Sequence, residues 1–468
     1  MSELATLSAL DAAAKVRASE VSAKAVVEAT LARIAALNPK LGAFTDVTAE
    51  RALAKAAALD AARVRGEALG PLAGATFAVK NLFDIKGLPT RAGSKINRER
   101  APASADATLI EKLEAAGAIL VGALNMGEYA YDFTGENAHD GPSRNPHDLG
   151  HMSGGSSGGS GSAVGGGLVP LALGSDTNGS IRVPSALCGI YGLKPTYGRL
   201  SRARSFPFVS SFDHLGPFAR SVGDLAAAYD AMQGMDPDDP AQAPRPLAST
   251  LASLGQGAAG LRIATLGGYF SKGAEPAVFA GLEGVARALG AVQVVELPEA
   301  GRARAAAFLI TMAEGGALHL DRLKSRAADY DPDTRDRLLA GAMLPAAWVV
   351  KAQKFRRWFR AQVLGVFKDV DVLLAPATPT RAPALGQKMF VLEGVETPVR
   401  ANLGLFTQPI SFIGLPVVAV PMWQKGSFLP TGVQAIAPPW REDLALRVAS
   451  QLEREGVCRA PIGRAAEV

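Results

Sequence analysis

The first 65 residues carry apolar side chains at helical spacing. In residues 22–37 these side chains recur every three or four positions up to Asn38-Pro39, and residues 48–63 show a second, alanine-rich pattern of the same kind. The segment lacks candidate catalytic residues. We therefore expect residues 1–65 to form a helical segment that packs on the rest of the chain and contributes to an oligomer interface.

Beyond residue 66, short apolar runs alternate with longer segments of helical period. Such runs predict buried strands. The expected strands cover residues 75–79, 118–121, 169–173, 261–264, 292–295, 370–374, 417–421 and 432–436, and the expected helices between them include 106–116, 157–166 and 182–188. This alternation is typical of an α/β fold, with a large mixed β-sheet core covered by helices on both faces.

One stretch interrupts the alternation. Residues 235–256 are rich in Pro, Asp and Ser, which predicts a linker or surface excursion. Strand-like runs resume after it, so we expect one large domain over residues 66–468 instead of two independent units.

Composition narrows the class of protein. Apolar residues make up 48% of the chain and charged residues 20%, as in ordinary globular enzymes. The net charge of +5 is small for 468 residues, and the basic run at 351–360 alternates with aromatic residues at helical spacing. That run indicates an amphipathic helix with a solvated face. With no membrane-length apolar run and no signal-peptide pattern, we expect a cytoplasmic protein with neither a nucleic-acid nor a membrane partner.

Cysteine and histidine usage argues against a metal centre. Cys188 and Cys458 form neither a disulfide framework nor a CxxC site, and the histidines show no HExxH spacing. We expect no metal and no cofactor.

Glycine and serine residues are concentrated in the same part of the chain. The chain has 50 glycines, and they cluster between residues 141 and 192. Within this cluster, residues 153–160 spell SGGSSGGS and residues 176–182 spell DTNGSIR. Backbone without side chains lets a substrate approach a hydroxyl closely, so the two segments predict a hydrolase with a serine nucleophile.

The serine needs a base. Residues 154–158 match the GxSxG elbow of histidine-dependent hydrolases, but GGSSGGS makes that match almost unavoidable, and His214 and His319 have no supporting local motif. Lys80, at the end of an apolar run, is the other option. Burial would have to lower its pKa from about 10.4 to roughly 7–8, a cost of about 4 kcal/mol. The residues alone leave both bases open.

Several motifs together resemble the amidase signature family. They keep the family's order and spacing over nearly the whole chain: VKN at 79–81, GGSSGGS at 154–160, DTxGSIR at 176–182, GxxGLKPT at 189–196 and PxGVQ at 430–434. The resemblance implies the amidase signature fold. It also implies Ser180 as the nucleophile, Ser156 after a cis peptide bond as a bridge, and Lys80 as the base.

The same resemblance implies an oxyanion hole made by the backbone N–H groups of Thr177, Asn178 and Gly179. Most family members have glycine at the position of Asn178. Asparagine tolerates left-handed backbone, so the loop geometry can survive. The Asn178 side chain adds a polar group beside the oxyanion site, and both a role in substrate choice and simple space filling stay open.

Residues 81–85, 93–97, 175–184 and 213–217 resemble a narrower group of the family, the hydrolases of 1-carboxybiuret. This implies cleavage of a small, anionic, urea-like carboxamide through an acyl-enzyme, with release of ammonia. It further implies a small non-catalytic partner subunit in a hetero-oligomer. We expect the segments 127–152 and 300–345 to be variable loops that shape the pocket.

An anionic amide needs cationic or N–H partners. The candidates for substrate contact are Arg182, Tyr131, Ser157, Arg91 and Asn137. Arg182 could equally have a structural role and hold the loop. Tyr131 could equally be a core residue with its hydroxyl group hydrogen-bonded. Three other functions also stay open: the glutamine-hydrolysing component of a tRNA-dependent amidotransferase, a histidine-dependent esterase, and a non-catalytic scaffold.

Overall fold

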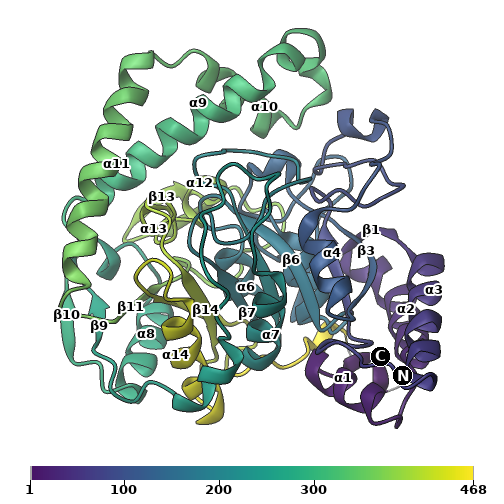
Figure 1. Ribbon diagram of the computed structural model, residues 1–468. Coiled ribbons are helices and arrows are strands. Elements are labelled where there is room, and N and C mark those ends of the chain that lie inside the picture. The colour runs from purple at the N-terminus through teal and green to yellow at the C-terminus, as the bar shows by residue number, and fades with distance from the viewer. Residues whose placement is uncertain (1–2, 467–468) are drawn as a thin grey trace.

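An 11-stranded mixed sheet forms the centre of the computed structural model, which describes residues 3–466 (Figure 1). The strand order is β1-β3-β2-β6-β8-β7-β14-β15-β11-β9-β10. The strands are β1 (Phe44–Val47), β2 (Thr76–Lys80), β3 (Ile119–Leu124), β6 (Leu171–Asp176), β7 (Tyr191–Lys194), β8 (His214–Ala219), β9 (Ile263–Leu266), β10 (Gln293–Val295), β11 (Val372–Pro376), β14 (Val417–Met422) and β15 (Thr431–Ile436). The predicted α/β fold is confirmed.

Helices cover both faces of the sheet. Side chains alternate along β2, so Phe77 and Val79 join the large apolar core that contains α4 and α7, while Ala78 joins the cluster that contains α2 and α5. The helices are α1 (Ala9–Arg17), α2 (Ala23–Leu41), α3 (Ala49–Val64), α4 (Thr108–Ala115), α5 (Gly158–Gly165), α6 (Arg182–Cys188), α7 (Val222–Met232), α8 (Pro276–Ala288), α9 (Ala300–Arg326), α10 (Pro332–Ala342), α11 (Ala346–Val366), α12 (Val399–Asn402), α13 (Gln408–Ser411) and α14 (Glu442–Arg454).

The N-terminal helices pack beside the β1 edge of the sheet, in purple at the right of Figure 1. The side chains of Ser8 and Ser22 cap α1 and α2 by accepting backbone N–H groups. The prediction that the helix at residues 22–37 stops at Asn38-Pro39 is wrong, because α2 continues to Leu41. Proline there removes only one hydrogen bond in the last turn, and Gly42, at φ 61°, then ends the helix.

Each strand expected from the apolar runs is present and starts within two residues of its predicted position. Strand β8 was not predicted, because Gly216 and Pro217 disfavour a central strand. The structure explains the glycine: a Cβ at Gly216 would lie 2.1 Å from Leu193 O on neighbouring β7.

Of two other segments with a predicted character, only residues 300–345 differ from the prediction. Residues 300–345 are mostly helical instead of loops, since α9 and α10 form a layer at the top of Figure 1. Residues 235–256 are irregular up to a short 3₁₀ helix at Leu251–Gln256. Asp236 and Asp239 in this excursion are buried and hold it by accepting hydrogen bonds.

Two small antiparallel pairs lie outside the main sheet: β4 (Arg144–Asn145) with β5 (Asp148–Met152), and β12 (Met389–Leu392) with β13 (Val395–Pro398). Within residues 3–466, every helix is too short or too polar to cross a lipid bilayer.

Candidate active site

Lys80 is the last residue of β2, and its side chain is completely buried. Strand β2 pairs in parallel with β6, with Val79 opposite Leu173, so the carboxyl ends of both strands meet at one edge of the sheet. There Lys80 Nζ donates to Ser156 Oγ at 2.7 Å and to Ser175 Oγ at 2.9 Å. The amine therefore joins hydroxyl groups from two separate segments.

Burial lowers the pKa of the Lys80 amine from 10.5 to about 7, although the negative charges of Asp213, Asp176 and Asp132 oppose the shift. A lysine with this pKa is mostly neutral just above pH 7 and has a free electron pair on nitrogen. Lys80 thus has the protonation behaviour of a general base.

Ser156 lies in the loop before α5, and the Gly155–Ser156 peptide bond is cis. The loop is so closely packed that a Cβ on Gly155 would lie 2.6 Å from Asp132 Oδ2. The next residue, Ser157, is also buried, and its hydroxyl donates to Ser175 O at 3.2 Å. Ser157 therefore ties the glycine–serine loop to β6.

Ser180 lies in the loop that connects β6 to α6, and it lines a cavity. Its hydroxyl makes no hydrogen bond to any residue that the structure describes. In the same described part of the chain, the backbone N–H groups of Thr177, Asn178, Gly179 and Ser180 also lack partners. Unpaired N–H donors beside a serine hydroxyl are what an oxyanion hole requires.

Thr407 holds this loop from the other side. Its hydroxyl donates to Asn178 O at 2.7 Å, and a Cβ on Gly179 would lie 2.2 Å from the same hydroxyl oxygen. The φ of Gly179 is +145°, which L side chains rarely adopt. Only glycine fits at this position.

A buried ion pair fixes the two ends of the loop. Arg182 Nε and Nη2 each lie 2.9 Å from the Asp176 carboxylate, and Arg182 Nη1 donates to Thr407 O and to Gln434 Oε1. Burial raises the pKa of Asp176, but the charge of Arg182 outweighs this effect and holds the pKa well below its usual value. The guanidinium of Arg182 is fully buried, and protein groups accept hydrogen bonds from its nitrogens. The structure therefore favours a structural role for Arg182 over contact with a substrate.

The cavity beside Ser180 is narrow, with a volume of about 20 Å³. Besides residues of the β6–α6 loop, its lining includes Tyr131, Thr311, Arg337 and Arg400. Thr311 comes from α9 and Arg337 from α10, so the 300–345 segment does shape the pocket, as helices.

Arg337 lies against Tyr131, with its guanidinium carbon 3.8 Å from the ring centroid. Its Nε donates to Asp333 O and its Nη2 to Tyr131 O, whereas Nη1 has no partner within the described chain. Arg400 is different, because the carboxylates of Asp132, Asp331 and Asp333 lie 3.4–3.5 Å from its nitrogens. Of the two arginines, Arg337 is the one without a carboxylate partner among the described residues.

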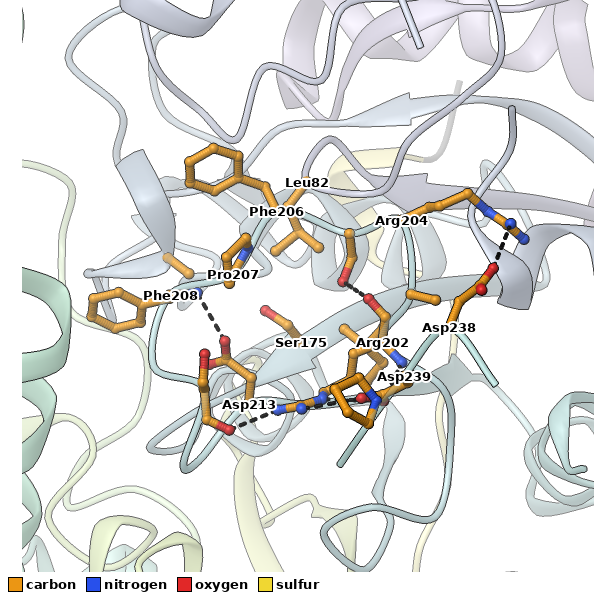
Figure 2. Close-up of a pocket in the computed structure, with 16 residues that line it drawn as sticks. Leu82, Ser175, Arg202, Arg204, Phe206, Pro207, Phe208, Asp213, Asp238 and Asp239 are labelled. Atoms are coloured by element: carbon orange, nitrogen blue, oxygen red, sulfur yellow. Dashed lines mark hydrogen bonds and ion pairs between the residues drawn. The ribbon is translucent and has the colours of Figure 1, made fainter. Parts of the chain in front are cut away.

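A second cavity, of about 260 Å³, is lined by Ser175, the residue whose hydroxyl bonds Lys80. Figure 2 shows this cavity. Ser175 and Asp213 lie at its inner end, and the Arg204–Asp238 pair lies toward the surface. Asp213 accepts hydrogen bonds from Thr177 Oγ1 at 2.6 Å and from Phe208 N at 2.8 Å. This cavity therefore approaches Lys80 through Ser175 instead of through Ser180.

The histidines are not placed to activate a serine. His214 Nδ1 bonds the carbonyl oxygens of Asp176 and Phe212, and His319 Nδ1 bonds Tyr330 Oη. Burial lowers the pKa of His319 to about 3 and that of His214 well below its usual value. This placement disfavours the histidine-dependent esterase.

Of the five predicted contact residues, four lie outside both cavities: Ser157, Arg182, Arg91 and Asn137. Arg91 pairs with Asp46 at 2.7 Å and with Asp140 at 3.7 Å. The Asn137 amide donates to Gly93 O and Met126 O, each at 2.7 Å, so it supports the loop structure. Tyr131, by contrast, does line the cavity of Ser180.

The sequence did not reveal Ser175, Asp213 and Arg337. Ser175 lies only one residue before the DTNGS motif, so its position at the strand end was an available signal. Asp213 belongs to the motif at 213–217 but had no assigned role. No local pattern distinguishes Arg337 from the other arginines of its segment.

The chain matches the sequence model of the Amidase family over residues 25–446. It is 55% identical to AtzE, a component of the 1-carboxybiuret hydrolase of Pseudomonas sp. (strain ADP), over 94% of this chain and 96% of that protein. It is 40% identical to the A component of the glutamyl-tRNA(Gln) amidotransferase of Anaeromyxobacter dehalogenans (strain 2CP-C), over 97% of each.

Solved structures agree with these relationships. An s-triazine catabolic enzyme, described with a vestigial protein complex, superposes with a TM-score of 0.96 at 53% identity, over 97% of this chain and 100% of that one. A bacterial aryl acylamidase of the amidase signature family superposes with a TM-score of 0.88 at 27% identity, over 97% of both chains.

Proposed function

The chain belongs to the amidase family of C–N hydrolases, and on that premise we propose that it cleaves a small urea-like carboxamide, 1-carboxybiuret or a close analogue, with release of ammonia. The observation that carries the proposal is the buried Lys80 amine bonded to Ser156, together with the unpaired Ser180 hydroxyl in the loop that follows β6. The relative at 55% identity supports the choice of substrate class.

We assign the base to Lys80, the bridge to Ser156 and the nucleophile to Ser180. Ser180 Oγ gives its proton to Ser156 Oγ, which passes its own proton to the neutral Lys80 Nζ. The bond between the two serines is not formed in the structure, so the proposal requires Ser180 to move within reach of Ser156 during the reaction.

Ser180 Oγ then bonds to the amide carbon, and the carbonyl electron pair moves onto oxygen. We propose that the unpaired N–H groups of Thr177, Asn178 and Gly179 bind this oxyanion. When the C–N bond breaks, the nitrogen takes the relayed proton and leaves as ammonia. A water molecule then gives a proton to the same relay and attacks the acyl carbon. The bond from this carbon to Ser180 Oγ breaks, and Ser180 Oγ takes the relayed proton back.

An anionic substrate requires a cation near the nucleophile. Arg337 lines the same cavity as Ser180 and keeps Nη1 unpaired within the described residues. We assign binding of the substrate carboxylate to Arg337. Arg182 we assign to holding the loop, and Tyr131 to the pocket wall.

We also propose a small partner subunit, because a structural relative is described with a protein complex. The helical segment at residues 1–65 is the proposed contact region. Light scattering of the full chain and of a variant lacking residues 1–65, with and without a partner, tests this assignment; unchanged assembly size would contradict it.

The function is tested by ammonia release from a panel of 1-carboxybiuret, biuret, allophanate, malonamate and glutamine. We expect turnover of the ureides and none by Ser180→Ala. A preference for glutamine would instead favour the amidotransferase-type relatives. Ammonia release that survives Ser180→Ala would refute the mechanism.

A further inference from the structure

We propose that Asn178 determines specificity by accepting a hydrogen bond from a substrate N–H that flanks the cleaved carbonyl. The site then selects ureides, which carry nitrogen on both sides of that carbonyl, over carboxamides, which carry carbon on one side. This inference rests on the proposed function and adds the residue that distinguishes ureides from carboxamides.

The Asn178 side chain is buried and rigidly held. It is 6% exposed and lines the same cavity as Ser180. Its Nδ2 donates to Thr311 Oγ1 at 2.9 Å, and its backbone oxygen accepts from Thr407 Oγ1 at 2.7 Å. The two threonines fix both the backbone and the orientation of the amide.

This orientation leaves Asn178 Oδ1 without a hydrogen-bond partner among residues 3–466, and the atom is inaccessible to bulk water. Buried polar atoms in folded proteins are nearly always paired, so an unpaired acceptor calls for an explanation. Tyr131 Oη, in the lining of the same cavity, is also buried and unpaired. Two unsatisfied polar groups beside one nucleophile are suited to a ligand that brings its own donors.

The missing donor is one that a ureide supplies. When Ser180 attacks the carbonyl of a terminal carbamoyl group, one nitrogen leaves as ammonia and the other stays bonded to the acyl carbon with its hydrogen. This N–H lies one bond from the reacting carbon, and Asn178 lies two residues before the nucleophile in the same loop. In a carboxamide the position is occupied by CH₂, which has no hydrogen to donate.

A hydrogen bond to Asn178 Oδ1 would explain the selectivity for ureides without any charged group. A neutral amide oxygen accepts an N–H bond, and a substrate that cannot donate leaves the buried acceptor unsatisfied. Sites built around such a bond reject analogues that lack the donor far more strongly than apolar pockets reject a missing methylene. We expect about a tenfold or larger effect from this one bond.

Allophanate and malonamate provide the matched pair, because they differ only by NH against CH₂ next to the cleaved carbonyl. The quantity to measure is the ratio of kcat/KM for allophanate to kcat/KM for malonamate, in the full chain with its partner. Comparing this ratio between wild type and variants cancels the intrinsic reactivities of the two amides. We expect Asn178→Ala to lower the ratio about tenfold or more.

Thr311 provides an independent pair of variants. Thr311→Val removes the acceptor that orients the Asn178 amide and is expected to lower the ratio, whereas Thr311→Ser keeps the hydroxyl and the ratio. If circular dichroism shows that Asn178→Ala does not fold, the two Thr311 variants decide the question.

The outcomes separate the two proposals. Ammonia release by wild type with a ratio that neither Asn178→Ala nor Thr311→Val changes would overturn the role of Asn178 and leave the proposed function standing. Wild type that releases ammonia from neither compound, nor from 1-carboxybiuret, would overturn both.

Discussion

The burial of Lys80 predicts a particular pH dependence of the rate. With a pKa of about 7, the amine is neutral in about three quarters of the molecules at pH 7.5, against about one in a thousand for an ordinary lysine. Because only the neutral amine accepts a proton, we expect kcat/KM to rise with pH through a midpoint near 7 and to level off above pH 8. The measurement is ammonia release between pH 5.5 and 9.5.

The same burial predicts that the base destabilises the folded chain. A folded-state pKa of about 7 against 10.5 disfavours folding by about 5 kcal/mol below pH 7. This penalty shrinks as the pH rises from 7 and vanishes above 10.5. Lys80→Met removes the penalty and loses two hydrogen bonds, worth about 1 kcal/mol each. We expect the variant to be inactive, yet more stable by about 3 kcal/mol at pH 6, with no advantage at pH 10.

Urea unfolding at pH 6, 8 and 10 measures this difference. The matched control is Lys351→Met on α11, which replaces an exposed lysine and is expected to change neither rate nor stability profile. A rate midpoint above pH 9, or a Lys80→Met variant that is less stable than wild type at every pH, would refute the assignment of a neutral buried base.

Three further variants test the surroundings of the nucleophile. Gly179→Ala places a Cβ 2.2 Å from a threonine hydroxyl and is expected to lower kcat at least 100-fold, while Gly365→Ala, with no atom within 4 Å and no left-handed backbone, leaves kcat unchanged. Arg182→Ala breaks a buried ion pair and is expected to lower the free energy of unfolding by about 3–5 kcal/mol, against less than about 1 kcal/mol for the exposed Arg262→Ala. Arg337→Ala is expected to raise KM for allophanate about tenfold and KM for neutral biuret much less, as steady-state kinetics would show; equal effects on both would argue against carboxylate binding.

The parts of the fold that follow simple periodicity were predictable. Apolar runs located β2 and β6, and their parallel pairing brings Lys80 to the hydroxyl-rich loops. The lysine became a candidate because it ends an apolar run, but only the resemblance to the amidase signature family assigned it as the base. Its protonation state depends on complete enclosure by the fold, which no run of neighbours in the sequence establishes.

The unpredicted parts depend on contacts between distant segments. Gly216 is required because the neighbouring strand β7 leaves no room for a side chain. Since glycine usually disfavours strands, strand β8 could not be predicted from its sequence. Helices α9 and α10 form part of the cavity wall. The pattern of polar residues in their sequences does not show which face of each helix lies against the loop of Ser180. Arg337 is therefore visible only after those helices are placed.

The partners of Arg182 set an order of events during synthesis. The guanidinium links Asp176 to Thr407, Ser411 and Gln434, which lie far later in the chain. The nucleophile loop consequently lacks its anchors until residue 434 has emerged from the ribosome. A nascent chain that stalls earlier carries Lys80, Ser156 and Ser180 but lacks three of the four side-chain and backbone partners that hold Arg182.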